Sequence, residues 1–397
     1  MKLPLIIGLV LLLTPRSVWS QWTETTHWDE AQTQVREVFL YRMQGRDTVR
    51  HGSYQIYYRN GTLWQEGQYK NGELDGLWFD YYENGQVKQE LPYVNGNLNG
   101  VLRYFLPDGA LYQTASYETD QLHGVSETFH PNGQISERSA YKQGVLDGTV
   151  EAWFEDGRKR FTMQYREGIP HGDQEIYYEN GNIRERSQKA NGVYQGEFRS
   201  YYKEYDDGTL QKICHYDAGK LQGDYRGFFP SGNPMLHCQY EGNMLTGTWT
   251  RYFDMPSQGP RLPVEEQGDY VQGEKTGTWR TYYPSGQVHT VGSYRDRKFQ
   301  GEWLVYHPEG TLKQKGGYEN GLAVGEFTMY YETGELKNRG MYRDDLKTGL
   351  WKTWYKDGTL LTEIEYLEGV RHGEARAYDE TGTLTETERY VHGEKQE

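Results

Sequence analysis

Residues Gly52 to Asp75 read GSYQIYYRNGTLWQEGQYKNGELD, and this stretch decides the fold. The next residue, Gly76, starts the same pattern again as GLWFDYYENGQVKQELPYVNGNLN. Each copy carries an aromatic pair, an Asn-Gly shortly after it and a second Asn-Gly near its end. A period of 24 residues indicates a repeat architecture, in which each copy packs mainly against its neighbours.

The pattern opens with a glycine fourteen times: at Gly52, Gly76, Gly100, Gly124, Gly148, Gly172, Gly196, Gly223, Gly247, Gly277, Gly301, Gly325, Gly349 and Gly373. Eleven of the thirteen intervals are 24 residues long, and the other two are 27 and 30 residues. The additional residues precede Gly208 and Gly259, so they lengthen one turn and leave the rest of the repeat unchanged. We therefore expect fourteen repeats over residues 52–397. Positions within a repeat are counted from the opening glycine, which is position 1.

The turn residues predict the chain direction. Asn-Gly between apolar stretches is a strong hairpin signal, because the tight turn needs positive φ. At the second turn Asp120, Asn243 and Asp345 replace glycine and tolerate such φ values, whereas Arg297 breaks the pattern. Consecutive strands joined by tight turns are antiparallel. We therefore expect an all-β fold: an elongated, single-layer, twisted antiparallel β-meander of repeated hairpins with about 28 strands.

The first twenty residues have the features of a secretory signal peptide. Lys2 precedes an apolar run from Leu3 to Leu13, and small residues precede a cleavage site between Ser20 and Gln21. The run is shorter than the ~20 residues of a membrane span, and an uncleaved anchor is the alternative. The sequence thus predicts export to a periplasm or the extracellular space.

Residues 21–51 form a lead-in between this segment and the repeats. Residues 21–34 are polar, and we expect a tail or a loosely docked segment there. Residues 35–42, VREVFLYR, alternate as a strand does and would cap the first repeat.

The composition limits the partners. The chain has 57 acidic and 43 basic residues, a formal net charge of −14. This balance argues against binding of nucleic acid or of anionic membranes. Aromatic residues make up 15% of the chain and it contains 48 glycines, which fits a thin fold with many turns.

Two cysteines, Cys214 and Cys238, share position 16 of adjacent repeats, where other repeats carry Gly67, Ala115 or Ser139. Equivalent positions of an antiparallel meander lie two strands apart, about 9.5 Å. A disulfide needs Cα atoms within about 7 Å, so we expect two buried, unpaired thiols and no Cys214–Cys238 disulfide. In a parallel β-helix the two residues would be about 4.8 Å apart and could bond.

Two adjacent columns are aromatic. Position 6 is aromatic in all fourteen repeats. Position 7 is aromatic in ten: Tyr58, Tyr82, Phe154, Tyr178, Tyr202, Phe229, Phe253, Tyr283, Tyr331 and Tyr355. Successive strand residues point to opposite faces, so if position 6 is inside, position 7 lies wholly or partly on the other face. These rings either stack across hairpins for stability or form a track that binds a partner.

Histidines also recur at fixed positions. His51, His123, His171 and His372 precede an opening glycine, and His130 and His307 occupy position 7. Repeated use of one position suggests turn chemistry or replacement of a ring. A metal site would need convergent ligands with distinct spacing, and no carboxylate pair stands out for acid–base catalysis. We expect no metal, no cofactor, no catalytic residues and no enzyme activity.

The pattern G-x-W-x-x-Y-Y-x-N-G-x-L-x-x-E-G-x-Y-x-N-G resembles the MORN repeat, and more closely its bacterial variant form. Gly277 to Gly301, GTWRTYYPSGQVHTVGSYRDRKFQG, is a good example. The resemblance covers residues 52–397. It implies one β-hairpin per repeat, stacked into an elongated sheet that serves as a scaffold for protein or membrane association.

These observations together predict an exported, non-enzymatic repeat scaffold that mediates protein–protein interaction. The alternative is a glycan- or cell-wall-binding protein that uses the aromatic track at position 7.

Overall fold

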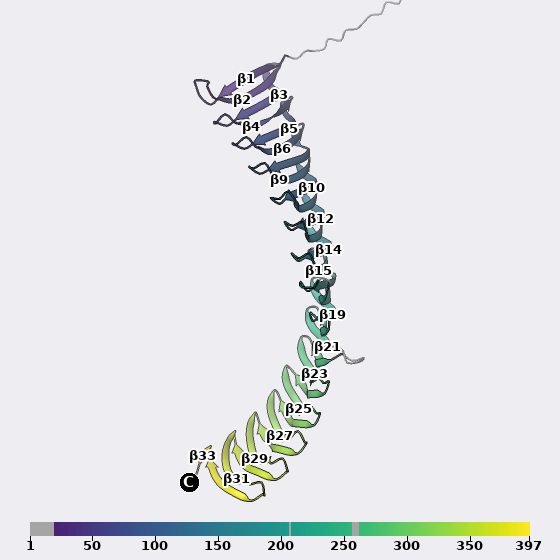
Figure 1. Ribbon diagram of the computed structural model, residues 1–397, viewed down its shortest axis with the longest axis vertical. Coiled ribbons are helices and arrows are strands. Elements are labelled where there is room, and N and C mark those ends of the chain that lie inside the picture. Colours follow the sequence, from purple (N-terminus) through teal and green to yellow (C-terminus); the bar gives the residue numbers. More distant parts are fainter. Residues whose placement is uncertain (1–19, 206–207, 256–261) are drawn as a thin grey trace, which may run out of the picture. The chain divides into compact units, whose positions relative to one another are not determined.

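A computed structural model describes residues 20–205, 208–255 and 262–397 (Figure 1). Residues 1–19 of the predicted signal peptide, residues 206–207 of one lengthened turn and residues 256–261 of the other lie outside the described residues. The chain divides into an N-terminal unit, residues 1–169, and a C-terminal unit, residues 170–397, and each is described by itself.

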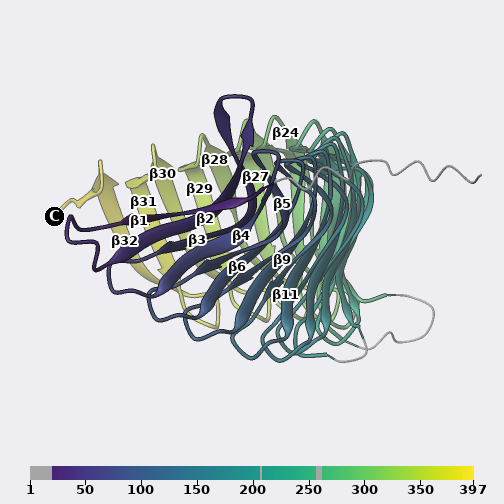
Figure 2. The same ribbon diagram turned by 90° about the horizontal axis from the view of Figure 1, so that it is seen from above.

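The strands of the N-terminal unit are β1 (Trp22–His27), β2 (Val35–Gln44), β3 (Asp47–Tyr57), β4 (Leu63–Lys70), β5 (Glu73–Tyr81), β6 (Val87–Val94), β7 (Asn97–Leu98), β8 (Gly100–Phe105), β9 (Leu111–Glu118), β10 (Gln121–Phe129), β11 (Ile135–Lys142), β12 (Val145–Trp153) and β13 (Lys159–Arg166). Figure 2 shows β1 to β6 lying side by side in chain order.

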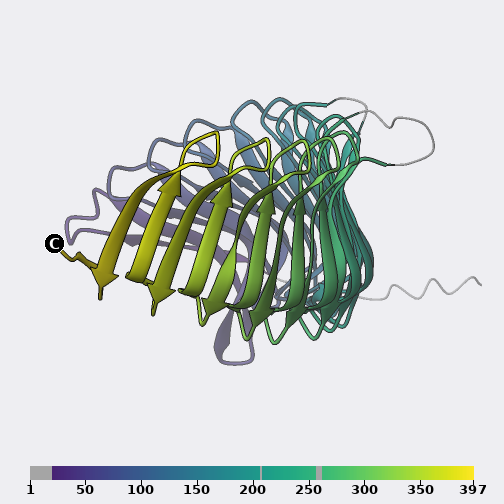
Figure 3. The ribbon, with the colours of Figure 1, turned by 90° about the horizontal axis from the view of Figure 1, so that it is seen from below.

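The strands that follow are β14 (Ile169–Tyr177), β15 (Ile183–Ala190), β16 (Val193–Tyr194), β17 (Gly196–Tyr201), β18 (Leu210–Asp217), β19 (Lys220–Phe228), β20 (Pro234–Glu241), β21 (Met244–Tyr252), β22 (Val264–Val271), β23 (Glu274–Tyr282), β24 (Val288–Arg295), β25 (Lys298–Tyr306), β26 (Leu312–Glu319), β27 (Leu322–Tyr330), β28 (Leu336–Arg343), β29 (Leu346–Trp354), β30 (Leu360–Leu367), β31 (Val370–Tyr378), β32 (Leu384–Val391) and β33 (Glu394–Lys395). Figure 3 shows the green and yellow strands of the C-terminal unit side by side in one layer.

All strands belong to one antiparallel sheet of 33 strands, which confirms the predicted β-meander. Among the described residues there is no helix, and hence none that is long and apolar enough to cross a membrane. The count exceeds the expected 28 because β1, β2 and β33 lie outside the predicted hairpins and two strands are interrupted, as β7/β8 and β16/β17.

The first turn of a repeat without an insertion is a tight four-residue turn that ends on glycine. In the first repeat, the backbone N–H of Gly61 donates to the backbone oxygen of Tyr58 at 3.0 Å. The backbone N–H of Tyr58 donates in turn to the backbone oxygen of Thr62 at 2.8 Å. Gly61 has φ of 85°, a value that glycine adopts without strain. Asn60 Oδ1 also accepts the Thr62 N–H at 2.9 Å, which explains the preference for Asn before this glycine.

The second turn has two central residues with positive φ, as a type I′ hairpin requires. Asn71 and Gly72 have φ values of 57° and 90°. Asp120 has φ of 63° in place of the glycine, and its Oδ1 accepts the Leu98 N–H at 2.7 Å. Asn243 and Asp345 do the same, with φ of 74° and 67°. The expectation of left-handed backbone at these residues is confirmed.

Arg297 also takes the left-handed conformation, with φ of 64°. Its guanidinium pairs with Glu274 at 2.6 Å. The exception found in the sequence is therefore an exception in residue type and not in turn geometry.

One face of the sheet, called here the core face, carries the buried rings, and they come from position 3. Trp78 is only 2% exposed and packs against the rings of Tyr54, Tyr69 and Tyr93 at 5.5, 5.1 and 6.4 Å. Its indole N–H donates to the Gln68 oxygen at 3.1 Å. The core of the N-terminal unit is thus a row of rings on one face.

The C-terminal unit repeats this arrangement. Trp351 is 4% exposed, contacts the rings of Tyr342 and Tyr366 at 5.1 and 6.4 Å, and donates its indole N–H to the Met341 oxygen at 3.1 Å. The same ring contacts and the same hydrogen bond thus recur at Trp78 and Trp351, whereas Trp279 donates its indole N–H to the Thr276 oxygen at 3.2 Å.

Where position 3 carries a large ring, position 16 of the preceding repeat is small because the ring lies directly on it. A Cβ added to Gly67 would lie 2.1 Å from the Trp78 ring, and one added to Gly340 would lie 2.1 Å from the Trp351 ring. Neither glycine has positive φ, so its absent side chain and not its backbone freedom is what the packing requires. The predicted small-residue position is confirmed.

Both cysteines fill this position and are buried and unpaired. Cys214 on β18 lies opposite Tyr225 on β19, and Tyr225 lies opposite Cys238 on β20. The two thiols are therefore two strands apart, as the antiparallel prediction requires, and the parallel β-helix is excluded. Burial raises the pKa of both thiols, to about 11 for Cys238.

The lead-in is more ordered than the sequence indicated. The strand expected over residues 35–42 is present as β2, but Trp22 to His27 is also a strand, paired with β2. Trp22 lies opposite Tyr41 and stacks on it at 5.9 Å. The prediction of a tail or loosely docked segment is therefore wrong for β1. That strand lacks the aromatic pair and Asn-Gly of the repeats, although its alternating Thr and Glu residues can pair at a sheet edge.

Candidate functional site

The tyrosines of position 7 form a ladder of hydrogen bonds along the first-turn edge. Tyr58 donates its hydroxyl to the backbone oxygen of Tyr81 at 2.8 Å, and Tyr331 donates to that of Trp354 at 2.7 Å. Tyr82, Tyr178, Tyr202, Tyr283 and Tyr355 donate likewise to Phe105, Tyr201, Phe228, Tyr306 and Tyr378. All seven tyrosine hydroxyls of this column are thus used within the sheet.

The rings of this column are half-buried and rest on their own hairpins. Tyr58 lies 5.8 Å from Trp64, and Tyr283 lies 4.6 Å from His289. Burial raises the pKa of Tyr58 above its ordinary value. Because position 7 begins the first turn, after the strand has ended at position 6, strand alternation does not decide its direction.

The remaining members of the column differ in chemistry. Phe154, Phe229 and Phe253 are half-buried and have no hydroxyl to donate. His130 and His307 place Nε2 at 3.0 Å from the Trp153 oxygen and at 3.3 Å from the Tyr330 oxygen. These two histidines therefore replace the tyrosine in the ladder, as ring substitution predicts.

Histidines before the opening glycine belong to the second turn. His51 Nδ1 accepts the backbone N–H of Asn71 at 3.2 Å, and His372 Nδ1 accepts that of His392 at 3.3 Å. Turn chemistry thus accounts for His51 and His372. No group of three or more His, Cys, Asp or Glu residues in the described part of the chain could hold a metal ion.

Position 6 does not form the core. Its tyrosines are mostly half-buried, with hydroxyls that bond polar groups on the face opposite the core, called here the outer face. Tyr81 donates to Glu66 Oε1 at 2.7 Å, and Tyr177 donates to Glu175 Oε2 at 2.6 Å. Burial, followed by the bond to Glu175, raises the pKa of Tyr177 to about 12. The assumption that position 6 is the inside column is therefore wrong for these tyrosines.

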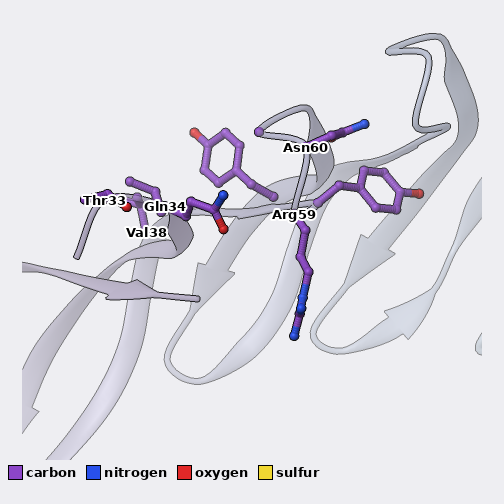
Figure 4. A pocket seen from close by; sticks show the side chains of 9 residues that line it. Thr33, Gln34, Val38, Arg59 and Asn60 are labelled. Carbon is purple, nitrogen blue, oxygen red and sulfur yellow. The ribbon is translucent and has the colours of Figure 1, made fainter. Parts of the chain in front are cut away.

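A cavity of about 480 Å³ lies beside the first turn of the first repeat (Figure 4). Thr33, Gln34 and Val38 line one side, and the Arg59 side chain points away from them. The neighbouring Trp28 donates its indole N–H to the Tyr57 oxygen at 3.2 Å, the bond that position-7 tyrosines make elsewhere. Sequence reasoning missed this cavity, because the lengthened turn at residues 28–34 has no counterpart among the repeats.

The outer face of the N-terminal unit is partly apolar. Leu77, Val101 and Val125 occupy position 2 of three consecutive repeats and are 43%, 42% and 45% exposed. They lie opposite Pro92, Ser116 and Ala140 of their own hairpins. No signal in the aromatic columns pointed to this row, although position 2 could have been read for it.

The outer face of the C-terminal unit is mainly acidic at the same position: its residues are Asp173, Glu197, Asp224, Thr248, Thr278, Glu302, Glu326, Leu350 and Glu374. Several acids pair with bases on the same face. Glu302 lies 2.8 Å from Lys315, and Asp224 lies 2.9 Å from Arg226.

Comparison with protein-family models identifies the repeat. The model described as MORN repeat variant matches residues 50–71, 74–95, 122–143, 170–188, 275–296, 299–320, 323–344, 347–368 and 371–392. The chain belongs to the MORN repeat variant family. Nine of the fourteen expected repeats are matched, and the count of fourteen stays a prediction.

Similarity to other proteins is weak. The curated proteins give no match. The crystal structure of TcdB2-TccC3-Cdc42 matches at 11% identity with a TM-score of 0.12, over 92% of this chain and 27% of that one. The Photorhabdus luminescens Tc holotoxin pore with the TccC3-D651A mutation matches at 11% identity with a TM-score of 0.14, over 90% of this chain and 23% of that one. A porin-like protein from Bacteroides uniformis matches at 10% identity with a TM-score of 0.12, over 77% of this chain and 93% of that one.

The chain spans about a quarter of the length of the first of these solved chains. Similarity at this level supports no inference about function.

Proposed function

We propose that this chain is an exported, non-enzymatic scaffold that binds another protein. MORN repeats are in general protein-binding repeat modules, and the family assignment brings that role to this chain as the first expectation. The proposal adds export, the absence of catalysis and the use of the outer face for binding.

The position-7 ladder is the observation that carries the proposal. Since every tyrosine hydroxyl of the column already donates its proton to the next repeat, none of them can donate a hydrogen bond to a sugar without breaking that bond. This use of the hydroxyls supports a stabilising role for the repeated aromatic residues. What varies from repeat to repeat is the outer face, apolar at Leu77 and acidic at Glu302, as expected where recognition is separate from the framework.

The charged groups of the outer face support a non-enzymatic role. Carboxylates there form ion pairs with bases, such as Glu90 with Arg103 at 2.9 Å and Glu127 with Arg138 at 2.7 Å, and they are partly exposed. Catalytic carboxylates are instead usually held in a cleft, where burial or a like charge shifts their pKa.

Export is tested with a topology reporter. Residues 1–40 fused to alkaline phosphatase, which is active only after export, should give activity in a bacterial host. A matched fusion with Ile6→Arg and Leu11→Arg should abolish that activity by interrupting the apolar run. Equal activity from both fusions, or none from either, would contradict export by this segment.

Binding is tested with the mature chain on a polysaccharide panel and on envelope proteins. Tyr178→Phe and Tyr202→Phe keep the rings and remove only hydroxyls, whereas Tyr178→Ala, Tyr202→Ala and Phe229→Ala remove the rings. A protein partner retained by all of these variants, with no polysaccharide bound, is the expected result. Saturable polysaccharide binding that survives the Phe changes and disappears with the Ala changes would instead establish the glycan alternative.

A further inference from the structure

We propose that the outer face of the N-terminal unit is a docking strip for one amphipathic helix of a partner protein. The strip is defined by Leu77, Val101 and Val125. The inference rests on the proposed protein-binding function and deepens it, since it states which face binds and what chemistry it takes.

The three side chains form one row across neighbouring strands. Leu77 on β5 lies opposite Pro92 on β6, and a Cβ added to Gly100, the residue before Val101, would lie 3.1 Å from the Pro92 ring. Val101 on β8 lies opposite Ser116 on β9, and a Cβ added to Gly124, the residue before Val125, would lie 3.4 Å from Ser116. The residues that separate the three side chains, Pro92 and Ser116, are small and uncharged, so the row stays continuous.

Two further aliphatic residues flank the row toward the second turns, one at each end, and the exposed Glu118 and Gln121 lie on the strands between them. Val94 ends β6 and is 48% exposed, and Val145 begins β12 and is 45% exposed. On the first-turn side the margin consists of ion pairs, Glu90 with Arg103 and Glu127 with Arg138. Because these charges neutralise one another, the margin repels neither sign of partner and the aliphatic row dominates the attraction.

The spacing of the row selects a helix over an extended strand. Equivalent residues of adjacent repeats are two strands apart, about 9.5 Å. Residues seven apart on one side of a helix are separated by about 10.5 Å. Residues that share a face of an extended strand are about 6.7 Å apart and fall out of step with the row. A helix crossing the strands, with an apolar residue at every seventh position, fits all three side chains.

The size of the strip argues against a second copy of the chain as the occupant. Five half-exposed aliphatic side chains offer at most a few hundred Å² of apolar surface. A stable dimer needs about 800 Å² per partner. One helix of three turns or more is the occupant that a strip of this size accommodates.

The C-terminal unit supplies an internal control. Glu302 and Glu326 occupy position 2 there, and covering them with an apolar helix face would bury charges. Leu350 is exposed to 44% but has acidic position-2 residues in the repeats before and after it. The helix should therefore bind to the N-terminal unit.

The test uses the mature chain and a designed fluorescent peptide of 22 residues, built on Ala, Glu and Lys with leucine at positions 1, 8, 15 and 22. Fluorescence anisotropy should show saturable binding that weakens at least tenfold in the double variant Leu77→Asp and Val101→Asp. Leu350→Asp is the matched control and should leave the affinity unchanged. All three substituted side chains are exposed, and circular dichroism of each variant verifies that the sheet is retained.

Three results would overturn the proposal: binding no stronger than that of a peptide with the same composition and scrambled leucines, equal binding by the double variant, or equal loss in the control. Sedimentation of the unbound chain excludes or establishes the other occupant. A dimer that the double variant dissociates would assign the strip to a second copy.

A photo-crosslinking amino acid placed at Val101 and, separately, at Glu326 distinguishes failure of the strip from failure of the protein-binding function. A discrete protein adduct at Glu326 without one at Val101 would refute the strip and keep the scaffold. No adduct at either position would refute both.

Discussion

Leu77 and Trp78 are neighbours in the chain and face opposite sides of the same strand. Trp78 is 2% exposed and contacts three tyrosines, whereas Leu77 is 43% exposed and lies over the outer face. The position-3 contacts recur in the C-terminal unit at Trp351, but the outer face there changes from apolar to acidic. The difference teaches that this single-layer sheet buries its core side chains on one face and leaves the residues of the other face free to vary.

The largest effect should come from pH, because the core face is rich in tyrosine hydroxyls. Burial raises the pKa of Tyr194 and Tyr240 to about 12, above the unperturbed value of about 10. Since the neutral form is favoured in the folded state, this stability is complete below pH 10 and is lost as pH rises toward 12.

Melting followed by circular dichroism at pH 8, 10 and 11.5 should therefore show a steep fall only above pH 10. Tyrosine absorbance at 295 nm should titrate later in the folded chain than in guanidinium. A melting temperature that is constant up to pH 12 would show that the core face does not depend on neutral tyrosines.

The next largest effect separates the two faces directly. Trp78→Ala should destabilise the surrounding hairpins by about 3–5 kcal/mol, since it leaves a cavity among three rings. Leu77→Ala, one residue away, should change stability by less than about 0.5 kcal/mol because its side chain is on the surface. Hydrogen exchange of the β4–β6 amides measures both, and similar values for the two variants would erase the distinction between the faces.

A smaller effect is expected at the small-residue position. Gly340→Ala adds a Cβ 2.1 Å from the Trp351 ring, and overpacking of this kind typically costs about 1–3 kcal/mol. Ser53→Ala on the outer face serves as the control. Equal melting temperatures of the two variants would show that the Trp351 ring moves aside without a loss of stability.

The smallest effect concerns a single hydroxyl of the ladder. Tyr178→Phe removes the 3.0 Å hydrogen bond to the Tyr201 oxygen and should reduce local stability by about 0.5–1.5 kcal/mol. Tyr112→Phe, at an exposed ring, should have no measurable effect. Faster exchange confined to β14–β17 is the expected signature, and unchanged exchange there would remove the stabilising role of the ladder.

The hairpins could be predicted because their determinants are local. Asn71-Gly72 specifies a type I′ turn by itself, and the 24-residue period places the next one. Gly67, Ser139 and Cys238 share position 16, and their size alone showed that this position takes small residues, before the ring that packs on it was known. Antiparallel pairing then followed, and with it the separation of the two thiols.

The identity of the buried column could not be predicted from regularity. Position 6 is always aromatic, yet position 3 forms the core although it ranges from Trp78 to Gln174 and Ala375. What fixes the inside is packing between repeats: the position-3 side chain must match the volume left by position 16 of the preceding repeat. Such matching depends on contacts across strands and is invisible to alternation along one strand.

The candidate binding surfaces were predicted only in part. The position-7 residues form an aromatic column in the sequence, but strand alternation could not give their direction, because Tyr58 lies in a turn where alternation no longer applies. The outer row at Leu77 gives only a weak sequence signal, three aliphatic residues at position 2 of consecutive repeats, since isolated aliphatic residues on a surface are common. Only the strand register brings three of them into one row.

The constant reach of the position-7 hydroxyl has a consequence for how such a chain can change in length. Tyr58 and Tyr178 each bond the carbonyl 23 residues further on, and Tyr202 makes the same bond across 26 residues because the additional ones lie within the turn. A gene that duplicates or loses one whole repeat therefore yields a chain in which every tyrosine finds an equivalent acceptor. Insertions confined to a first turn are tolerated in the same way, whereas a deletion of a few residues within a strand would break the phase of all contacts beyond it.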